Sequence, residues 1–290
     1  MRKTLAWAGL FCLLAAPATA QDRAGFLLRA GNDTLSVELF SRTDGGVRGR
    51  LLVRKRLPVT YEASVRADGT VSELAVAVLQ PDAPPEALPR QQASLRFTGD
   101  SVIAHSRTGD STSVERFATR PGALPYHAQV PMVALLEQIV RRARVIGGDS
   151  VSLPVFVLGG GGRTLDASIV FRGDTAVVRL GTLHARLAVD AQGRVLGGRA
   201  QADQVIERLA SVPDRLLSAQ VPDYSAPAGA PYRAEEVRIT TRAGHVLAGT
   251  LTLPLNARGR VPAVVTITGS SAQDRDHNTQ FGAPIAEYRR

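Results

Sequence analysis

Apolar and polar positions alternate with a period of two residues over most of residues 24 to 117. The clearest runs place Leu35, Val37 and Leu39 on one face, then Tyr61, Ala63 and Val65, then Leu74, Val76 and Val78. A period of two is typical of half-buried β-strands. Turn-forming residues separate the runs, at Asp44-Gly45-Gly46, Asp68-Gly69, Gly99-Asp100 and Gly109-Asp110. Because these turns are short, the pattern predicts a meander of antiparallel hairpins in a curved sheet.

A helical period replaces the alternation between residues 131 and 147. Apolar side chains recur at i, i+3, i+4, i+7, i+8 and i+11, at Met132, Leu135, Leu136, Ile139, Val140 and Ala143. The opposite side carries Glu137, Gln138, Arg141 and Arg142. Pro131 suits the first turn of a helix, and Gly147 suits its exit. The pattern predicts one strong helix with an apolar face to bury.

Strand patterns resume after this helix, at residues 151–158, 167–171, 175–180, 185–189 and 195–199. We therefore expect residues 21–219 to be mainly antiparallel β, with about nine or ten strands and one long helix laid across the sheet. This outline resembles the half-barrel sheet and plugging helix of periplasmic lipoprotein-carrier-like domains. The resemblance leaves two interpretations open. Either the concave face binds a lipid or other apolar ligand, or the helix fills the groove and the domain is a rigid accessory unit.

The composition changes at residues 220–232, which hold three prolines, one glycine and three alanines without periodicity. Such a segment is typical of a semi-extended linker, so the chain is divided into residues 21–219, the linker, and residues 233–290. Beyond the linker, residues 235–241 and 245–253 form a predicted hairpin that turns at residues 242–244. The run from Val264 to Ile267 is apolar and β-branched without alternation, which favours a parallel strand buried on both faces, and Gly269 supplies a sharp exit.

Two stretches of this last region match a family pattern. Residues 247–254 read LAGTLTLP, and residues 262–277 read PAVVTITGSSAQDRDH. They resemble the opening of the secreted esterase and prolyl-oligopeptidase-like branch of the α/β-hydrolase superfamily, with its L-x-G-T-L-x-x-P and P-A-V-V-x-I-x-G-S-G-P-Q-D-R-D-E patterns. Ser271, Ala272 and His277 depart from the glycine, proline and glutamate of that pattern. The resemblance implies that residues 233–290 are the incomplete start of an α/β-hydrolase sheet.

The resemblance also implies roles for the loop after Ile267. The backbone N–H of Ser270 or Ser271 is the candidate oxyanion-hole donor for acyl hydrolysis, with no preference between the two. Gly269, Gln273, Asp274, Arg275 and Asp276 form the supporting loop. Asp274 and Asp276 flank Arg275, a spacing that favours a local ion-paired turn over catalytic acids or a metal pair.

The chain contains no G-x-S-x-G sequence, and the acid and histidine of a hydrolase triad would follow that serine. The main hypothesis is therefore an exported serine hydrolase of small esters or short peptides whose Ser-Asp-His triad lies beyond Arg290, with this chain inactive on its own. The alternative hypothesis is a non-enzymatic periplasmic β-rich binding module for a lipid or other apolar ligand.

The first twenty residues have the three regions of a secretory signal, namely Arg2-Lys3, an apolar run over residues 5–16, and Ala18-Thr19-Ala20 before the predicted cleavage. Export to the periplasm or the outside follows, without stable membrane insertion, because no stretch reaches the roughly eighteen apolar residues of a spanning helix. Cys12, the only cysteine, lies within this segment, so the mature chain has no thiolate chemistry.

Net charge is +9, and few aromatic residues lie between the basic ones. The arginines are scattered singly except for two clusters, Arg54-Lys55-Arg56 and Arg141-Arg142-Ala143-Arg144. This pattern does not favour nucleic-acid binding, which needs clustered basic and stacking side chains. The histidines lack metal-ligand spacing, and the four glycines at 159–162 lack the lysine of a phosphate loop. We therefore expect no metal and no cofactor, and the sequence leaves the oligomeric state open.

Overall fold

The computed structural model describes residues 22–31, 33–53, 57–79, 88–128, 130–159, 161–201, 203–216, 224–256 and 258–267. Within these ranges, fifteen strands form one sheet, and a separate hairpin follows. The strands of the sheet are β1 (Asp22–Ala30), β2 (Asp33–Thr43), β3 (Gly46–Val53), β4 (Val59–Val65), β5 (Val71–Val78), β6 (Gln91–Thr98), β7 (Ser101–Thr108), β8 (Ser111–Ala118), β9 (Leu124–His127), β10 (Ser150–Leu158), β11 (Arg163–Arg172), β12 (Thr175–Leu180), β13 (Leu183–Val189), β14 (Val195–Ala200) and β15 (Gln204–Leu209). Helix α1 (Val133–Ile146) lies between β9 and β10, and the short 3-10 helix η1 (Asp214–Leu216) follows β15.

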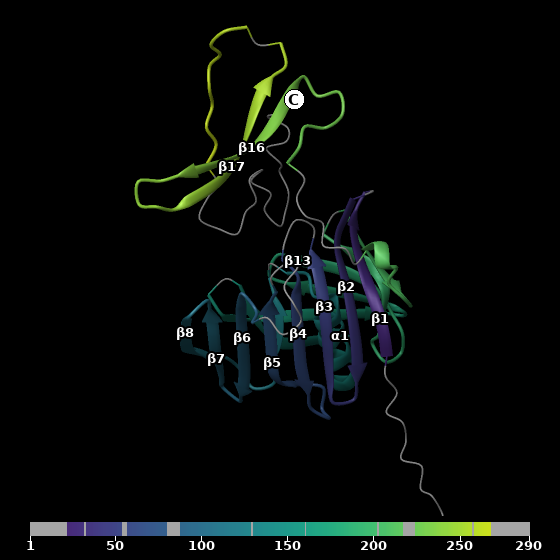
Figure 1. Cartoon of the computed structure of the whole chain (residues 1–290). Helices are drawn as coiled ribbons and strands as arrows, with labels where there is room; N and C mark the ends of the chain where they lie inside the picture. The colour runs from purple at the N-terminus through teal and green to yellow at the C-terminus, as the bar shows by residue number, and fades with distance from the viewer. Residues whose placement is uncertain are drawn as a thin grey trace, which may run out of the picture.

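The strand order is β8-β7-β6-β5-β4-β3-β2-β1-β15-β14-β13-β12-β11-β10-β9. The chain thus builds the sheet outward from β1 to the edge strand β8, crosses to the opposite edge at β9, and returns to pair β15 with β1. Neighbours are antiparallel except β9 and β10, which are parallel and joined through α1. Figure 1 shows β1–β8 as one layer, with α1 behind it and the returning strands crossing behind the helix.

The core lies between these two layers. Buried apolar side chains from the inner faces of both layers surround α1, whose Met132, Leu135, Ile139 and Val140 are almost fully enclosed. Phe97 and Phe117 of one layer contact Phe156 of the other, with ring centroids 6.1 and 5.7 Å apart. Helix α1 therefore fills the groove that an open half-barrel would leave free.

The structure confirms the mainly β class and the single α-helix within the described ranges. The predicted turns occur at the β2–β3, β4–β5, β6–β7 and β7–β8 connections, and Gly69, Gly99 and Gly109 adopt positive φ there. The strand count was underestimated, because β1, β9 and β15 lack a clear period of two. Their pairing is set by long-range contacts that a local pattern does not carry.

On β2, the alternate positions that carry Val37 and Leu39 do not face the core. Register with β3 and β4 places Glu38, Phe40 and Arg42 on the inner face, so Val37 and Leu39 point outward. Val37 packs in a small outer cluster with Leu27 and Leu52, beneath Leu209, Val212 and Leu216. Glu38 and Arg42 are buried, which means that β2 turns charged side chains toward the helix.

The predicted second hairpin is present as β16 (Tyr232–Thr240) and β17 (Val246–Pro254), closed at Thr241 and Gly244. The buried parallel strand expected after it is not found. Residues 261–267 form no strand, and Val264, Val265 and Ile267 are 88%, 82% and 82% exposed. The continuation into an α/β-hydrolase sheet is therefore not supported. The domain division at residues 220–232 stays a prediction.

Candidate ligand-binding site

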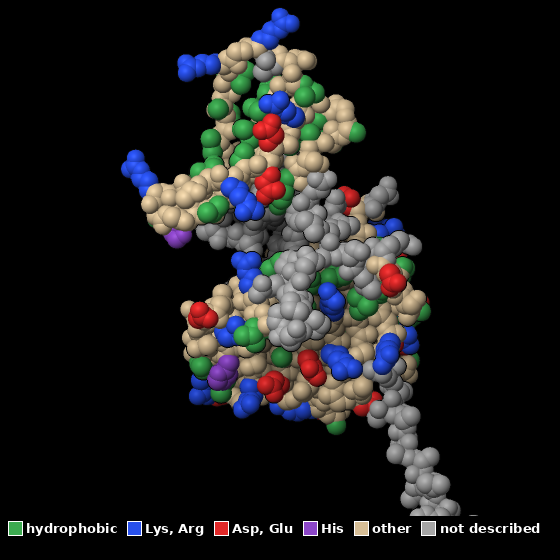
Figure 2. Space-filling view, viewed as in Figure 1, with side chains coloured by type: hydrophobic (Ala, Val, Ile, Leu, Met, Phe, Trp, Pro, Cys, Tyr) green, Lys and Arg blue, Asp and Glu red, His purple; other side chains and the backbone are tan. Residues whose placement is uncertain are grey.

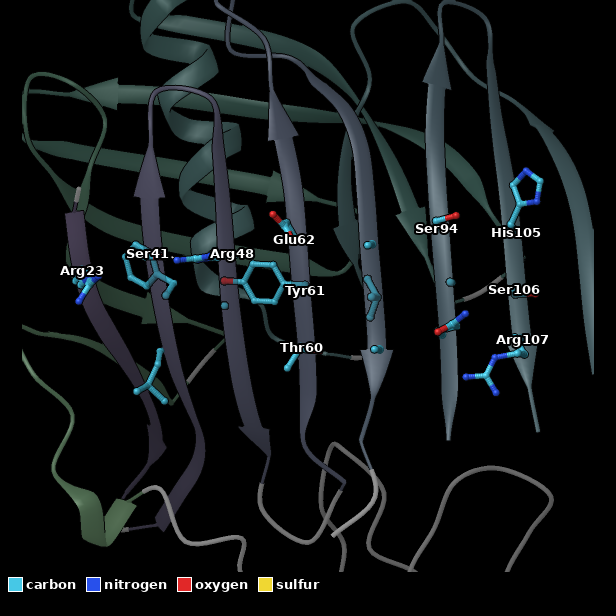
Figure 3. A pocket seen from close by; sticks show the side chains of 18 of the residues that line it. Arg23, Ser41, Arg48, Thr60, Tyr61, Glu62, Ser94, His105, Ser106 and Arg107 are labelled. Carbon is cyan, nitrogen blue, oxygen red and sulfur yellow. Dashed lines mark hydrogen bonds between the residues drawn. The ribbon is translucent and has the colours of Figure 1, made fainter. Parts of the chain in front are cut away.

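A cavity of about 1060 Å³ lies on the outer face of the β1–β8 layer, opposite α1. Its walls are outward-facing side chains of β1 to β8 together with residues 210–212. Figure 3 shows the labelled side chains distributed along these strands, with the helix behind them. The volume lies at the upper end of the range for small-molecule sites, roughly 300–1,000 Å³.

The floor of the cavity is built from small residues. Ala75 and Ala77 of β5 and Ser94 of β6 occupy outward positions at the centre of the layer. Leu39 and Val114 add larger apolar surface toward the sides. Short side chains on these two adjacent strands leave space that long side chains would fill. The hollow therefore follows from the size of the residues at alternate positions.

Charged and polar groups surround this apolar floor. Arg23, Arg48, Arg107 and Glu62 line the cavity, so basic side chains outnumber acidic ones, and His105 lies near Ser94 in the close-up. Arg107 donates to the carbonyls of Pro89 and Gly109 at 3.1 Å each, and Arg48 donates to Ser41 Oγ at 3.2 Å. On the wider face, basic and acidic side chains are both present (Figure 2).

The wall formed by residues 210–212 depends on Gly25. A Cβ at Gly25 would lie 2.2 Å from a methyl group of Val212 and 2.9 Å from the Glu38 carbonyl oxygen. The missing side chain lets the segment after β15 lie directly on β1. Val212 then joins the outer apolar cluster that includes Leu27 and Leu209.

The layer beneath the cavity is fixed to α1 by Glu38 of β2. Its Oε2 accepts a hydrogen bond from the N–H of Val133 at 2.7 Å, and its carboxylate also accepts from the N–H of Ala134 at 3.2 Å. Met132, at the N-cap position, makes no side-chain capping bond. Glu38 therefore supplies the acceptor and the negative charge that a helix N-terminus favours.

Tyr61 reaches Glu38 from two strands away. The Tyr61 hydroxyl on β4 donates a hydrogen bond to Glu38 Oε1 on β2, and its ring passes over Gly49 of the intervening β3. A Cβ at Gly49 would lie 2.4 Å from the Tyr61 oxygen. Only a glycine at this position leaves room for the ring.

A second buried group, Glu137 of α1, joins the two layers. Arg42 of β2 donates to Glu137 Oε1 at 3.1 Å, while Arg208 of β15 donates to Glu137 Oε2 at 2.8 Å. The N–H of Val195 also donates to Oε2, at 2.9 Å. Arg208 also donates a hydrogen bond to Asp22 Oδ2, at 2.6 Å. These hydrogen bonds and ion pairs give the buried Glu137 carboxylate its partners, on the side of α1 opposite the apolar face.

Burial raises the pKa of Glu38 to about 7, although the hydrogen bonds from Tyr61, Val133 and Ala134 act in the opposite direction. Burial also raises the pKa of Tyr61 well above its ordinary value. The same cause lowers the pKa of Arg42, and the charge of Glu137 counteracts it. Desolvation is thus the largest cause of the pKa shifts of Glu38, Tyr61 and Arg42.

The cavity is lined by described residues that were not predicted as site residues. Gly269, Ser270, Ser271, Gln273, Asp274, Arg275 and Asp276 all lie outside the described residues, as does His277. Within the described part of the chain, no group of three or more His, Cys, Asp or Glu side chains is arranged to hold a metal ion. In the same part, no helix has the length and apolarity needed to cross a membrane.

The sequence analysis did not identify the cavity residues. A usable signal was present, because Ala75, Ala77 and Ser94 are short residues at alternate positions opposite the buried phase. Their alignment across strands depends on register, however, which the sequence alone does not show.

No protein-family model and no curated protein matches the sequence. Two solved structures are similar in outline. A DUF1089 family protein from Pseudomonas aeruginosa is 17% identical with a TM-score of 0.41, and the alignment covers 68% of this chain and 97% of that one. A β-barrel-like protein of domain of unknown function DUF1849 from Brucella abortus is 10% identical with a TM-score of 0.38, covering 66% of this chain and 95% of that one.

The structure corrects the family resemblance. The prediction that the chain is the front end of a serine hydrolase is wrong, because the start of the hydrolase sheet that it requires is not found among the described residues. The described residues themselves form a large β-sheet around one helix, and the segment expected to be the central hydrolase strand is exposed and irregular. The alternative, a β-rich binding module, agrees better with these findings.

Proposed function

We propose that the protein is a non-enzymatic binding protein for a lipid or other apolar ligand, held in the cavity on the outer face of β1–β8. One observation carries this proposal, namely a hollow of about 1060 Å³ with a floor of small side chains on the outer face of the sheet. The groove around α1 is not the binding site, because the helix fills it. The signal-like first twenty residues support export to the periplasm or the outside.

The cavity favours an amphiphile with an anionic end. Arg23, Arg48 and Arg107 line it against Glu62 alone among the acidic side chains of the described wall. An apolar body would lie over Ala75 and Ala77, and an acidic head group would contact the guanidinium groups of Arg23 and Arg48, which lie two strands apart. Burying apolar ligand surface contributes about 25 cal/mol per Å² before the costs of association.

A fluorescent apolar probe, 1-N-phenylnaphthylamine, tests the proposal. We expect saturable binding to the wild-type protein and competition by a long-chain fatty acid. The variant Ala75→Phe/Ala77→Phe fills the floor and should weaken probe binding at least tenfold. Ala188→Phe is the control, because Ala188 is an exposed strand alanine on β13, outside the cavity.

Two results would overturn the proposal. One is the absence of saturable binding to the wild type. The other is an equal loss of binding in Ala188→Phe, which would show that the probe reports general surface adhesion. Native mass spectrometry of protein purified from its producing cells gives an independent readout, because a retained ligand appears as a mass shift in the wild type and is absent from the filled variant.

A further inference from the structure

Four arginines that are scattered along the sequence lie together on the outer face of β11–β14. Alternation along these strands turns the buried residues Phe171, Val178 and Leu187 toward the core. The intervening positions face outward, and they line a second hollow of about 510 Å³. Its exposed basic side chains are Arg172, Arg179, His184, Arg186 and Arg199.

Strand register brings these charges close to one another. Arg186 of β13 is directly opposite Arg199 of β14, and Arg179 of β12 is directly opposite His184 of β13. Side chains in such pairs have Cβ atoms about 4.5–5.5 Å apart, and like charges placed there are destabilising. The directly opposite pair of guanidinium groups, Arg186 and Arg199, is therefore unfavourable by itself, and a bound anion would relieve the repulsion.

Within the residues that the structure describes, none of the four arginines forms an ion pair with a carboxylate. The described wall of the hollow contains no Asp or Glu. Ser168 and Gln201 add polar groups at the rim, and Val170 and Val177 form a half-buried apolar floor. The hollow is therefore electropositive, and its guanidinium groups are available to an anion.

We propose that this hollow binds a compact ligand carrying two or more phosphate groups. Guanidinium groups donate paired, parallel hydrogen bonds to phosphate oxygens, and four of them around one hollow can contact several oxygens at once. The described lining residues include no Phe, Tyr or Trp, which disfavours stacking of nucleic-acid bases on this face. The valines lie at the floor rather than protruding, which disfavours insertion into a membrane surface.

Isothermal titration with inorganic pyrophosphate at low salt tests this site. We expect binding to the wild-type protein that weakens as salt increases. The variant Arg186→Gln/Arg199→Gln should weaken it roughly tenfold or more, because each lost bond joins two charged groups. The control Arg50→Gln/Arg96→Gln removes the same net charge from exposed positions on β3 and β6, and it should change the affinity less than twofold.

A second variant, Arg179→Gln/His184→Gln, should also weaken binding, because it removes the neighbouring basic pair. An equal loss in the β3 and β6 control would overturn the proposal, since it would indicate net charge alone. Failure of the wild type to bind pyrophosphate would do the same. Phosphatidylglycerol vesicles form the remaining arm, and binding to vesicles without binding to pyrophosphate would contradict a compact soluble ligand.

Discussion

Glu38 Oε2 accepts a hydrogen bond of 2.7 Å from the N–H of Val133, so a carboxylate on the second strand caps a helix that begins 95 residues later. This contact determines how the fold is organised. It ties the outer layer, which carries the proposed lipid site, to the helix around which the sheet curls. It also places an ionisable group where burial opposes its charge.

We expect protein stability to fall as pH increases through the range in which Glu38 ionises. The unfolded carboxyl loses its proton near pH 4.5, whereas the folded carboxyl retains it to about 7. Between these two pH values the folded state therefore binds more protons than the unfolded state. The resulting stabilisation is fully present below pH 4.5 and is lost as pH rises through 7. The free energy of unfolding falls by on the order of 3 kcal/mol over this range. Urea unfolding from pH 5 to 8 should show a flatter dependence for Glu38→Gln than for the wild type. Glu62→Gln, which changes an exposed carboxylate on β4, should keep the wild-type slope; identical slopes for all three proteins would contradict this account.

Gly49→Ala should destabilise the protein by about 1–3 kcal/mol, because the new methyl group collides with the Tyr61 ring. The collision displaces the hydroxyl from Glu38. Gly45→Ala is a matched control, since a Cβ at Gly45 meets nothing within 4 Å and its φ is not in the left-handed region. Thermal and urea unfolding measure both variants. A loss of stability in Gly45→Ala as large as that in Gly49→Ala would show that helix capping through Tyr61 is not the cause.

Glu137→Ala should lower the free energy of unfolding by about 3–5 kcal/mol, because it leaves Arg42 and Arg208 buried without their shared carboxylate. Asp166→Asn removes an exposed ion pair with Arg120, whose partners are 51% and 59% exposed. That change should lower the free energy of unfolding by less than about 1 kcal/mol. Equilibrium unfolding of the two variants measures the difference in their free energies of unfolding. Comparable losses of stability would mean that the buried ion pairs of Glu137 stabilise the protein no more than the exposed pair does.

The cavity on the β1–β8 face should prefer dodecanoate over dodecanol, by roughly threefold to tenfold for one or two solvent-exposed charge contacts. The variant Arg23→Gln/Arg48→Gln should remove this preference and leave dodecanol binding unchanged. Competition against the fluorescent probe measures both ligands. If the variant binds dodecanol more weakly by the same factor as dodecanoate, the arginines shape the cavity rather than select the head group.

Local pattern was sufficient for the helix and for most strands, because periodicity and turn residues act within a few positions along the chain. Leu135, Ile139 and Ala143 recur at helical spacing and are buried as predicted. The hairpin β16–β17 and its turn at residues 242–244 were likewise predicted. The hydrolase resemblance was wrong because a whole sheet was inferred from a short motif. Val264 and Val265, which that sheet would bury, are exposed.

The sequence by itself determined the β class, the helix and the position of the turns, since these depend on local period and on residues suited to particular backbone angles. Tertiary structure decided which face of each strand meets the core. It turned Glu38 and Arg42 inward, aligned Ala75 with Ser94 across two strands, and placed Arg186 opposite Arg199. These relationships depend on register and on the return of β15 to β1, which are set by contacts between residues far apart in the chain.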